Sequence, residues 1–370
     1  MELKVPEYIL SIKPYTPGKP IEELEREYGI SGSIKLASNE NPLGPCPKAV
    51  DAMKASMQDI HRYPDGSGYY LTRKLAEKHD VRPDNVVLGN GSDDVIGMLA
   101  RTLLQAGDEA VMTAPSFLMY EILVRSVGAA PVFVPLNNLA VDLDAIASAI
   151  TEKTRMIFIN NPNNPTGTFI KQDAFEAFLK RLPPSLTVVL DEAYIEFARD
   201  PSCLNGLSLI DENPPIAVLR TFSKIYGLAG IRIGYGVMPA EMAGLLHRVR
   251  QPFNTSALAQ AGAVAALDDE DFLYQTLELV ATELDFLQTA LNKMGVTSFP
   301  TQANFFLIDV KRDADRVFQE MLKEGVIIRS MVSYGYPRYI RVNVGKRQEN
   351  LRFLEAFERV MDKTAQEPGG

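Results

Sequence analysis

Short apolar runs alternate with helical patterns through the middle of the chain. The strand-like runs are residues 85–89, 109–114, 131–136, 156–160, 187–192, 216–221 and 231–238. Several of them are apolar at consecutive positions, as expected of strands that are buried on both faces of a parallel sheet. The segments between them, such as 92–107 and 173–182, carry apolar residues at helical spacing. This alternation predicts an α/β domain with a mainly parallel sheet.

The pattern changes beyond about residue 250. A long helical segment, 256–295, leads into shorter strand-like runs at 303–310, 326–330 and 339–345, which predicts a second, smaller α+β domain. The opening is rich in proline and glycine and is expected to form an extended arm. The expected organisation is an N-terminal arm at 1–35 that packs with the small domain, a large domain at 36–250 and a small domain at 251–370.

Composition and charge restrict the class of protein. The chain has 370 residues, 46% hydrophobic and 23% charged, with a net charge of −9, which is typical of a soluble globular protein. The negative charge disfavours nucleic acid and anionic membrane as partners. Cys46 and Cys203 are too few for a disulfide framework and do not have the spacing of a zinc site. The absence of a signal-like or membrane-spanning run indicates a cytoplasmic protein.

The segment "GNGSDD" (89–94) follows a strand-like run at the end of the sheet where ligands usually bind. Gly91, Ser92 and Asp93 stand at the start of a helix, where Ser92 is expected to be the cap. Free N–H groups at such a helix start suit a phosphate. The same residues also suit an ordinary turn. The segment does not complete the dinucleotide motif GxGxxG, and no Walker A motif occurs, so both nucleotide classes are disfavoured.

Two further strand ends carry polar residues. The segment "NPNNPTG" (161–167) places three asparagines at the mouth of a buried sheet, where their amides need partners. The segment "DEAY" (191–194) places Asp191 at the end of an apolar strand. A buried carboxylate is costly unless a cation or a strong donor meets it. A helix-capping aspartate is the simpler alternative for Asp191.

The segment "TFSKIYGLAGIRIG" (221–234) follows the next strand and contains Ser223, Lys224 and Arg232. A loop lysine that reaches solvent is one interpretation of Lys224, and an amine kept for covalent chemistry is the other. A free lysine has a pKa of roughly 10.4 and is protonated at neutral pH, whereas burial among apolar neighbours lowers the pKa and makes the amine nucleophilic.

A single ligand would explain these polar groups together. A phosphate would use the amides of Gly91 and Ser92 together with Ser223 and Arg232. An aromatic nitrogen base would pair with Asp191, and a phenolate oxygen would be held by Asn164 and Tyr194. An aldehyde would form an imine with Lys224. These four features describe pyridoxal 5′-phosphate (PLP).

The three motifs "NPNNPTG", "DEAY" and "TFSKIYGLAGIRIG", in this order and spacing, resemble those of the fold-type I PLP-dependent aminotransferases. The segments "IKPYTPGKP", "LASNENPLGP", "RYPDGSGYYLTRKLA" and "VIIRS…YIRVNVG" narrow the resemblance to the histidinol-phosphate aminotransferases. The resemblance covers almost the whole chain. It implies a large domain with a mainly parallel seven-stranded sheet flanked by helices, together with a smaller α+β domain. The implied reaction converts histidinol phosphate and 2-oxoglutarate into imidazole acetol phosphate and glutamate, in histidine biosynthesis.

The resemblance also implies a role for each residue that matches the family's motifs. Lys224 resembles the Schiff-base lysine, which also moves the proton between substrate and cofactor, and Asp191 resembles the acid that keeps the pyridine nitrogen protonated. Tyr194 matches a group on the phenolic oxygen and counts with these two as catalytic. The implied cofactor-binding set is Gly91, Ser92, Asp93, Phe117, Asn164, Asp191, Tyr194, Ser223, Lys224, Arg232 and Tyr63.

Two aromatic residues of this set carry separate expectations. Phe117 falls where an aromatic ring stacks on the cofactor, although core packing alone would also explain it. Some family members have a tyrosine there, with a hydroxyl near the substrate phosphate, and this chain lacks that hydroxyl. Tyr63 resembles a tyrosine that reaches the phosphate of the other subunit's cofactor, which implies a homodimer with shared sites.

Substrate binding is expected from residues near the two ends of the chain. Strict alternation in 339–344 puts Arg341 on one face of a strand, either as an outward surface group or, as the resemblance implies, as a fork that grips the substrate's anionic end. Arg329 is a similar case. Tyr15 and Asn41 lie where the family's arm lines the substrate pocket, although both also suit ordinary loops. Asn164 is expected to contact the substrate as well.

Alternative functions stay open at this point. An aromatic amino-acid aminotransferase would share the scaffold and an aromatic-ring pocket. A lyase similar to the threonine-phosphate decarboxylases would also bind an amine that carries a phosphate. A regulator with an aminotransferase-like domain is disfavoured, because the chain has no helix-turn-helix segment ahead of the domain and no basic face.

Overall fold

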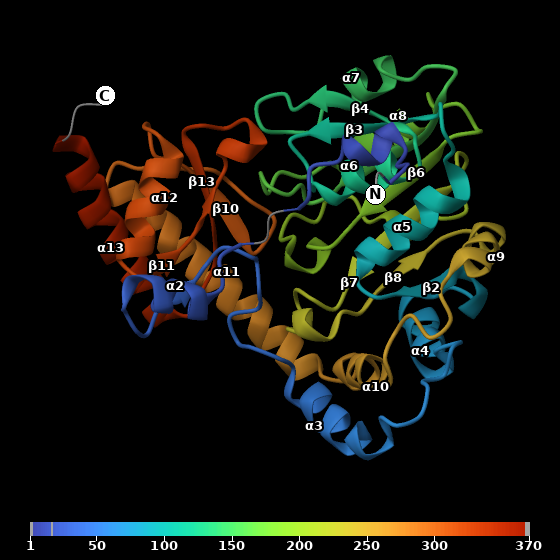
Figure 1. Ribbon diagram of the computed structural model, residues 1–370, viewed down its shortest axis with the longest axis horizontal. Coiled ribbons are helices and arrows are strands. Elements are labelled where there is room, and N and C mark those ends of the chain that lie inside the picture. The colour runs from blue at the N-terminus through green and yellow to red at the C-terminus, as the bar shows by residue number, and fades with distance from the viewer. Residues whose placement is uncertain (1–2, 16–17, 367–370) are drawn as a thin grey trace.

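The computed structural model describes residues 3–15 and 18–366, and it is built around two sheets (Figure 1). The larger sheet has seven strands in the order β2 (Val86–Gly89), β8 (Gly234–Val237), β7 (Ile216–Thr221), β6 (Thr187–Asp191), β5 (Thr154–Asn160), β3 (Glu109–Ala114) and β4 (Ala130–Pro135). Strand β8 is antiparallel to both of its neighbours, and the other pairs are parallel. The expectation of a mainly parallel seven-stranded sheet is confirmed.

Helices cover both faces of this sheet, which is why its central strands contain runs of consecutive apolar residues. Val188 and Leu190 of β6 face one apolar cluster, whereas Val189 between them faces the other. The cluster on the Val189 side includes residues of α5 (Ser92–Leu103), α6 (Met119–Ser126) and α9 (Ala240–Val249). The opposite cluster includes residues of α4 (Tyr69–His79), α7 (Leu143–Ser148) and α8 (Gln172–Leu179).

The second sheet is antiparallel and lies in the C-terminal part of the chain. Its strand order is β12 (Arg329–Ser330), β13 (Tyr339–Asn343), β10 (Phe305–Asp309) and β9 (Thr297–Ser298). The accompanying helices are α11 (Glu270–Lys293), α12 (Ala314–Lys323) and α13 (Arg347–Gln366). Helix α10 (Ala257–Ala266) instead packs against α3 (Pro47–Ser56) and α4, beside the larger sheet (Figure 1).

The N-terminal segment is less extended than expected. It contains α1 (Glu7–Leu10) and α2 (Ile21–Tyr28), and residues 1–2 and 16–17 of the predicted arm lie outside the described residues. Helix α2 forms because acidic residues occupy its first turn and Leu24 is buried against Leu322 and Ile327 of the small domain. Strand β1 (Ile34–Lys35) then pairs in parallel with β11 (Val326–Ile327).

Six short 3-10 helices complete the described elements. They are Met57–Asp59, Pro83–Asn85, Ile195–Phe197, Gly206–Leu209, Ala229–Ile231 and Val332–Tyr334. No helix in residues 3–15 and 18–366 is both long and apolar enough to cross a membrane. Within the same residues, no cluster of three or more His, Cys, Asp or Glu side chains has the arrangement of a metal site.

Candidate active site

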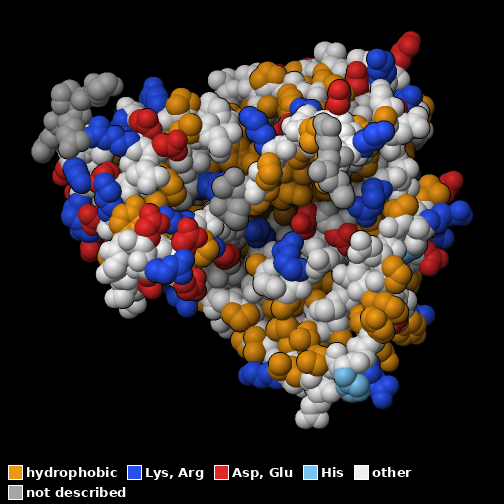
Figure 2. All heavy atoms as spheres, in the orientation of Figure 1, with side chains coloured by type: hydrophobic (Ala, Val, Ile, Leu, Met, Phe, Trp, Pro, Cys, Tyr) orange, Lys and Arg blue, Asp and Glu red, His pale blue; other side chains and the backbone are white. Residues whose placement is uncertain are grey.

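A cavity opens where β5, β6 and β7 end, on the side of the large sheet that faces the small domain. It is lined by Ser92, Asp93, Phe117, Asn160, Asn164, Asp191, Ala193, Tyr194, Thr221, Ser223, Lys224, Ala229 and Arg232. Residues from four separate sequence motifs therefore meet in one place. In Figure 2, basic and acidic side chains gather in the hollow between the two halves of the molecule.

Lys224 lies three residues beyond the end of β7, in a tight turn. Gly227 permits this turn because its φ is 68° and an added Cβ would lie 2.0 Å from the carbonyl oxygen of Gly44. The Lys224 Nζ donates a hydrogen bond to the carbonyl oxygen of Ser38 at 3.0 Å. Burial, together with the positive charge of Arg341, lowers the pKa of Lys224 to about 8. About a tenth of this amine is therefore unprotonated at pH 7, far more than for a lysine of ordinary pKa.

Asp191 is the last residue of β6 and is only 3% exposed. Its Oδ2 accepts a hydrogen bond from the Tyr120 hydroxyl at 2.6 Å, and its Oδ1 accepts one from the Ala193 amide at 3.1 Å. Burial raises the pKa of Asp191 to about 6, although these two bonds oppose the rise. Because both donors are neutral, a cationic ligand group in the cavity would meet an uncompensated carboxylate.

The turn after β5, which contains the predicted asparagines, lies beside the end of β6, where Asp191 is located. Asn160 donates from Nδ2 to the Asp191 carbonyl oxygen at 2.9 Å, and its Oδ1 accepts from the Asn164 amide at 2.6 Å. These bonds fix the position of Asn164, whose side chain lines the cavity. Of the three asparagines in the predicted motif, Asn161 donates to the Leu204 carbonyl oxygen at 3.1 Å and Asn164 Oδ1 accepts from Arg341. The buried Oδ1 of Asn163 has no partner, so the expectation holds only in part.

Tyr194 lies across the cavity from this turn. Its hydroxyl oxygen accepts a hydrogen bond from Asn39 Nδ2 at 3.0 Å, and its ring packs edge-on against Phe305. Burial raises the pKa of Tyr194, so the group stays a neutral hydroxyl. Since Asn39 supplies one donor, the hydrogen of Tyr194 is available for a second oxygen in the cavity.

One end of the cavity is suited to an anion. Helix α5 begins at Ser92, and its N-cap is Gly91 rather than the predicted Ser92. Gly91 has φ 85°, and an added Cβ would lie 2.3 Å from Arg232 Nη2. Arg232 donates from Nη2 to Asp93 Oδ1 at 2.9 Å, and Ser223 lines the same cavity. Backbone N–H groups, two hydroxyls and a guanidinium therefore converge here.

Arg341 of β13 is buried rather than outward-facing, with an exposed fraction of 6%. Its Nη1 donates to Asn164 Oδ1, and its Nη2 donates to the Ala37 carbonyl oxygen at 2.8 Å. The buried Nε has no hydrogen-bond partner. A buried guanidinium with a free donor is a potential site for an anionic substrate group.

The two other residues expected near Arg341 lie on its outer side. Arg329 is half-buried and is its cross-strand neighbour. Tyr15 is 46% exposed. Burial is the main cause that lowers the pKa of Arg341, and the positive charge of Arg329 acts in the same direction, whereas Tyr15 opposes it. The three side chains therefore belong to one region, although none of them lines the cavity of Lys224.

Asn41 and Tyr63 are also absent from the lining of this cavity. Asn41 donates from Nδ2 to the Ile225 carbonyl at 2.8 Å and to Thr276 Oγ1 at 3.2 Å. It therefore anchors the turn after Lys224 to α11. Tyr63 is 83% exposed and stacks on Phe253 with a centroid distance of 4.7 Å.

Sequence reasoning missed three residues that hold the site. Tyr120 donates a hydrogen bond to Asp191, and Asn39 donates one to Tyr194. Asn160 holds the turn after β5 through the Asn164 amide. Only Asn160 had a usable signal, because it is a polar residue at the very end of an apolar run. Tyr120 lies inside a helical pattern with no local mark of its role.

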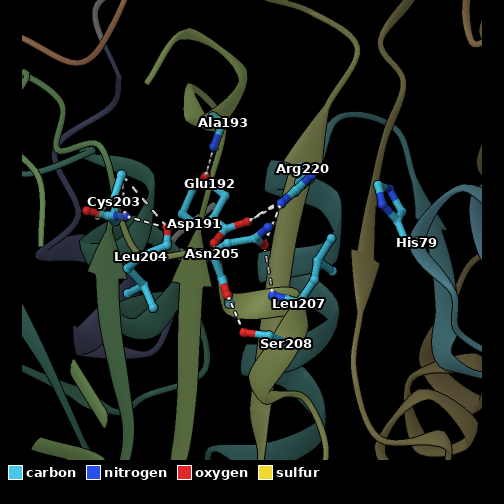
Figure 3. Close-up of polar contacts among 12 residues, drawn as sticks. His79, Asp191, Glu192, Ala193, Cys203, Leu204, Asn205, Leu207, Ser208 and Arg220 are labelled. Carbon is cyan, nitrogen blue, oxygen red and sulfur yellow. Dashed lines mark hydrogen bonds and ion pairs between the residues drawn. The ribbon is translucent and has the colours of Figure 1, made fainter. Parts of the chain in front are cut away.

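A buried ion pair stabilises the strand ends from the other face of the sheet (Figure 3). Arg220 of β7 donates from Nε and Nη2 to Glu192 Oε2 at 3.0 and 2.7 Å, and Glu192 Oε1 accepts from the Gly206 amide at 2.6 Å. Arg220 also reaches Asn205 Oδ1 at 3.1 Å. The pair therefore joins Glu192, which follows Asp191, to β7, the strand that precedes Lys224.

Comparisons with known proteins agree with this geometry. The chain matches the family described as "Aminotransferase class I and II" over residues 31–357. It is 50% identical over 360 residues to the histidinol-phosphate aminotransferase of Desulfotalea psychrophila, covering 96% of this chain and 95% of that protein. It is 46% identical over 359 residues to that of Moorella thermoacetica, covering 97% and 93%.

A solved structure extends the agreement to the fold. The crystal structure of histidinol-phosphate aminotransferase from Sinorhizobium meliloti in complex with pyridoxal-5′-phosphate gives a TM-score of 0.91 at 27% identity, covering 98% of this chain and 99% of that chain. The chain therefore belongs to the class I and II aminotransferase family.

Proposed function

We propose that the protein is a PLP-dependent histidinol-phosphate aminotransferase, which transfers the amino group of histidinol phosphate to 2-oxoglutarate in histidine biosynthesis. The relatives from Desulfotalea and Moorella carry this name, and the Sinorhizobium relative was solved with PLP. The observation that carries the proposal is the shared cavity of Lys224 and Asp191. It combines an amine of lowered pKa with a buried carboxylate and an anion-binding end.

The donor groups of the cavity fit PLP. The phosphate end would be formed by Gly91, Ser92, Asp93, Ser223 and Arg232. The absence of a side chain at Gly91 leaves space beside Arg232 that a Cβ would fill. Asp191 would pair with the pyridine nitrogen, Asn164 and Tyr194 would hold the phenolic oxygen, Phe117 would cover the ring, and Lys224 would hold the aldehyde carbon. When bound, PLP supplies a ring that accepts the electron pair released at the substrate carbon.

The residues of the chain then supply positioning and proton transfer. Lys224 accepts a proton at Nζ and returns it, which its pKa of about 8 permits near neutral pH. Asp191 would keep the ring nitrogen protonated through its negative charge, and Tyr194 would donate its hydroxyl hydrogen to the phenolic oxygen. Arg341 binds the anionic end of the substrate through its free Nε–H, with Arg329 and Tyr15 beside it.

The reaction is tested by half-reactions of the purified protein with histidinol phosphate, phenylalanine, tyrosine and phosphothreonine. We expect histidinol phosphate to be the preferred amino donor. A preference for phenylalanine or tyrosine would indicate the aromatic aminotransferase alternative. Release of carbon dioxide from phosphothreonine would instead identify a lyase. Phe117→Tyr provides a matched variant, because it restores the hydroxyl that some family members carry.

We further propose a homodimer in which Tyr63 completes the phosphate end of the partner's site. Hydrophobic side chains gather on the lower part of the molecule in Figure 2, over α3 and α10. The segment that follows α3 carries Met57, Ile60 and Tyr63, which are 54%, 60% and 83% exposed. An aromatic stack of Tyr63 on Phe253 at this surface is better suited to a covered interface than to water.

Mixing two inactive variants tests this arrangement. A dimer of one Tyr63→Ala subunit and one Lys224→Ala subunit contains one intact site if Tyr63 acts across the interface. Activity should therefore return on mixing. Absence of any return, with mixed dimers verified by mass, would place Tyr63 outside the partner's site. The cytoplasmic location stays a prediction from the sequence.

A further inference from the structure

Tyr120 contacts the Asp191 carboxylate from the helical layer behind the sheet. Asp191 and Val189 lie on the same side of β6, because alternate residues of a strand share a face. That side is covered by α6, on which Tyr120 is fully buried. The Tyr120 hydroxyl donates to Asp191 Oδ2 at 2.6 Å, a short distance typical of a strong bond to a charged oxygen.

The ring of Tyr120 is held from two sides. It stacks on Phe158 with a centroid distance of 4.9 Å and an interplanar angle of 11°. Its other contact is edge-on with Phe117, at 5.5 Å and 85°. Because Phe117 itself lines the cavity, the turn into α6 and its first residues connect the cavity wall to the carboxylate. The hydroxyl is therefore fixed in position before any ligand binds.

We propose that Tyr120 is a positioning residue, which keeps Asp191 ionised and aimed at the ring nitrogen of the cofactor. This inference rests on the proposed function, since it concerns the same cavity. Tyr120 does not line that cavity and acts only through Asp191.

The electrostatic surroundings of Asp191 explain why such a donor is needed. Burial is the largest influence and favours the neutral acid, and the negative charges of Glu192, directly after β6, and of Asp93 on α5 act in the same direction. The Tyr120 hydroxyl and the Ala193 amide favour the carboxylate. Tyr194, beyond β6, also faces the group, and it is neutral. Without Tyr120, Asp191 would be more often protonated and could not pair with a protonated ring nitrogen.

The test measures the dissociation constant of PLP for the full-length protein as a function of pH. Wild-type affinity should fall on the acidic side as Asp191 becomes protonated. A hydrogen bond to a charged group changes an equilibrium by about ten- to hundredfold. In Tyr120→Phe we therefore expect this fall to move upward by about one to two pH units, with binding weaker by about two- to tenfold at neutral pH.

Two controls separate positioning from general stability. Tyr235→Phe also removes a buried hydroxyl, which is bonded to His79 at 2.8 Å and not to Asp191. This variant should leave unchanged the pH at which the affinity for PLP falls. In the Asp191→Asn background, adding Tyr120→Phe should have no further effect on the pH dependence, because the group that titrates is absent.

An equal loss of affinity at every pH in Tyr120→Phe would overturn the inference and leave Tyr120 a packing residue. If the phenylalanine variant does not fold, a fluorinated tyrosine at position 120 provides the same test, since it keeps the hydroxyl and makes it a stronger donor. The decrease of PLP affinity should then occur at a lower pH than in the wild type. A decrease at the same pH would equally refute the positioning role of Tyr120. A wild-type protein that binds no PLP at any pH would contradict the proposed function itself.

Discussion

Removal of the Arg341 guanidinium should reduce substrate capture far more than cofactor binding. A guanidinium has five N–H donors. In this structure Nη1 contacts Asn164 and Nη2 contacts Ala37, while the buried Nε is without a partner. An anionic group that takes two charge-assisted bonds at about 1.5–3 kcal/mol each would lose about 3–6 kcal/mol in Arg341→Met. That loss corresponds to about a hundred- to ten-thousandfold in kcat/KM.

The assay is the half-reaction with histidinol phosphate, followed by the change in cofactor absorption. Arg341→Lys keeps the charge but not the planar fork, so we expect about a ten- to hundredfold loss, the equivalent of one bond. The matched control is Arg338→Lys, because Arg338 is an exposed arginine that pairs with Asp309 near the start of the same strand. It should behave as wild type. If both Arg341 variants retain the wild-type kcat/KM, Arg341 does not bind the substrate and its burial has another cause.

Three further predictions concern the strand ends. The rate at which the cofactor-free protein captures PLP should rise as pH passes through about 8, because the reactive form of Lys224 is the unprotonated amine; a rise only near the usual lysine pKa would contradict the burial argument. Arg220→Met should lower the free energy of unfolding, measured in urea, by about 3–5 kcal/mol, since it leaves Glu192 buried and unpaired. Adding Glu192→Leu to this variant should recover part of the loss. An Arg220→Met protein as stable as the wild type would refute this prediction. Gly91→Ala should weaken PLP binding by about tenfold or more through backbone strain, whereas Gly230→Ala, with nothing within 4 Å of its added Cβ, should bind normally.

The parts of the site that follow strand ends could be predicted from the sequence. Asp191, Ser223 and Lys224 come directly after apolar runs, and parallel strands bring such ends to one edge. The apolar runs predict the strands, and the alternation with helices predicts that these strands are parallel. Residues at their carboxyl ends are therefore expected to lie close together. The seven-stranded sheet was predicted for the same reason, with its strand number supplied by the family resemblance.

The parts that depend on packing between distant segments could not be predicted. The Tyr120 hydroxyl meets Asp191 from a helix far earlier in the chain, and nothing in its helical pattern marks the contact. Alternation placed Arg341 on one face of its strand but could not show that this face is buried.

Two neighbouring asparagines show the same limit. Asn41 was expected at the pocket, whereas Asn39 contacts Tyr194 and Asn41 anchors the turn after Lys224. The backbone at Asn39 has φ 58°, a conformation that asparagine tolerates better than most residues. The local sequence permits this conformation at Asn39, but the neighbouring segments decide which amide faces the site.

The central claim is that Lys224 is the amine that holds the cofactor. The most direct measurement is reduction of the PLP-loaded protein with borohydride, followed by peptide mapping by mass spectrometry. We expect the cofactor mass on the peptide that contains Lys224, and loss of the internal-imine absorption and of turnover in Lys224→Ala. Label on a different lysine, or a Lys224→Ala variant that still turns over histidinol phosphate, would contradict the account.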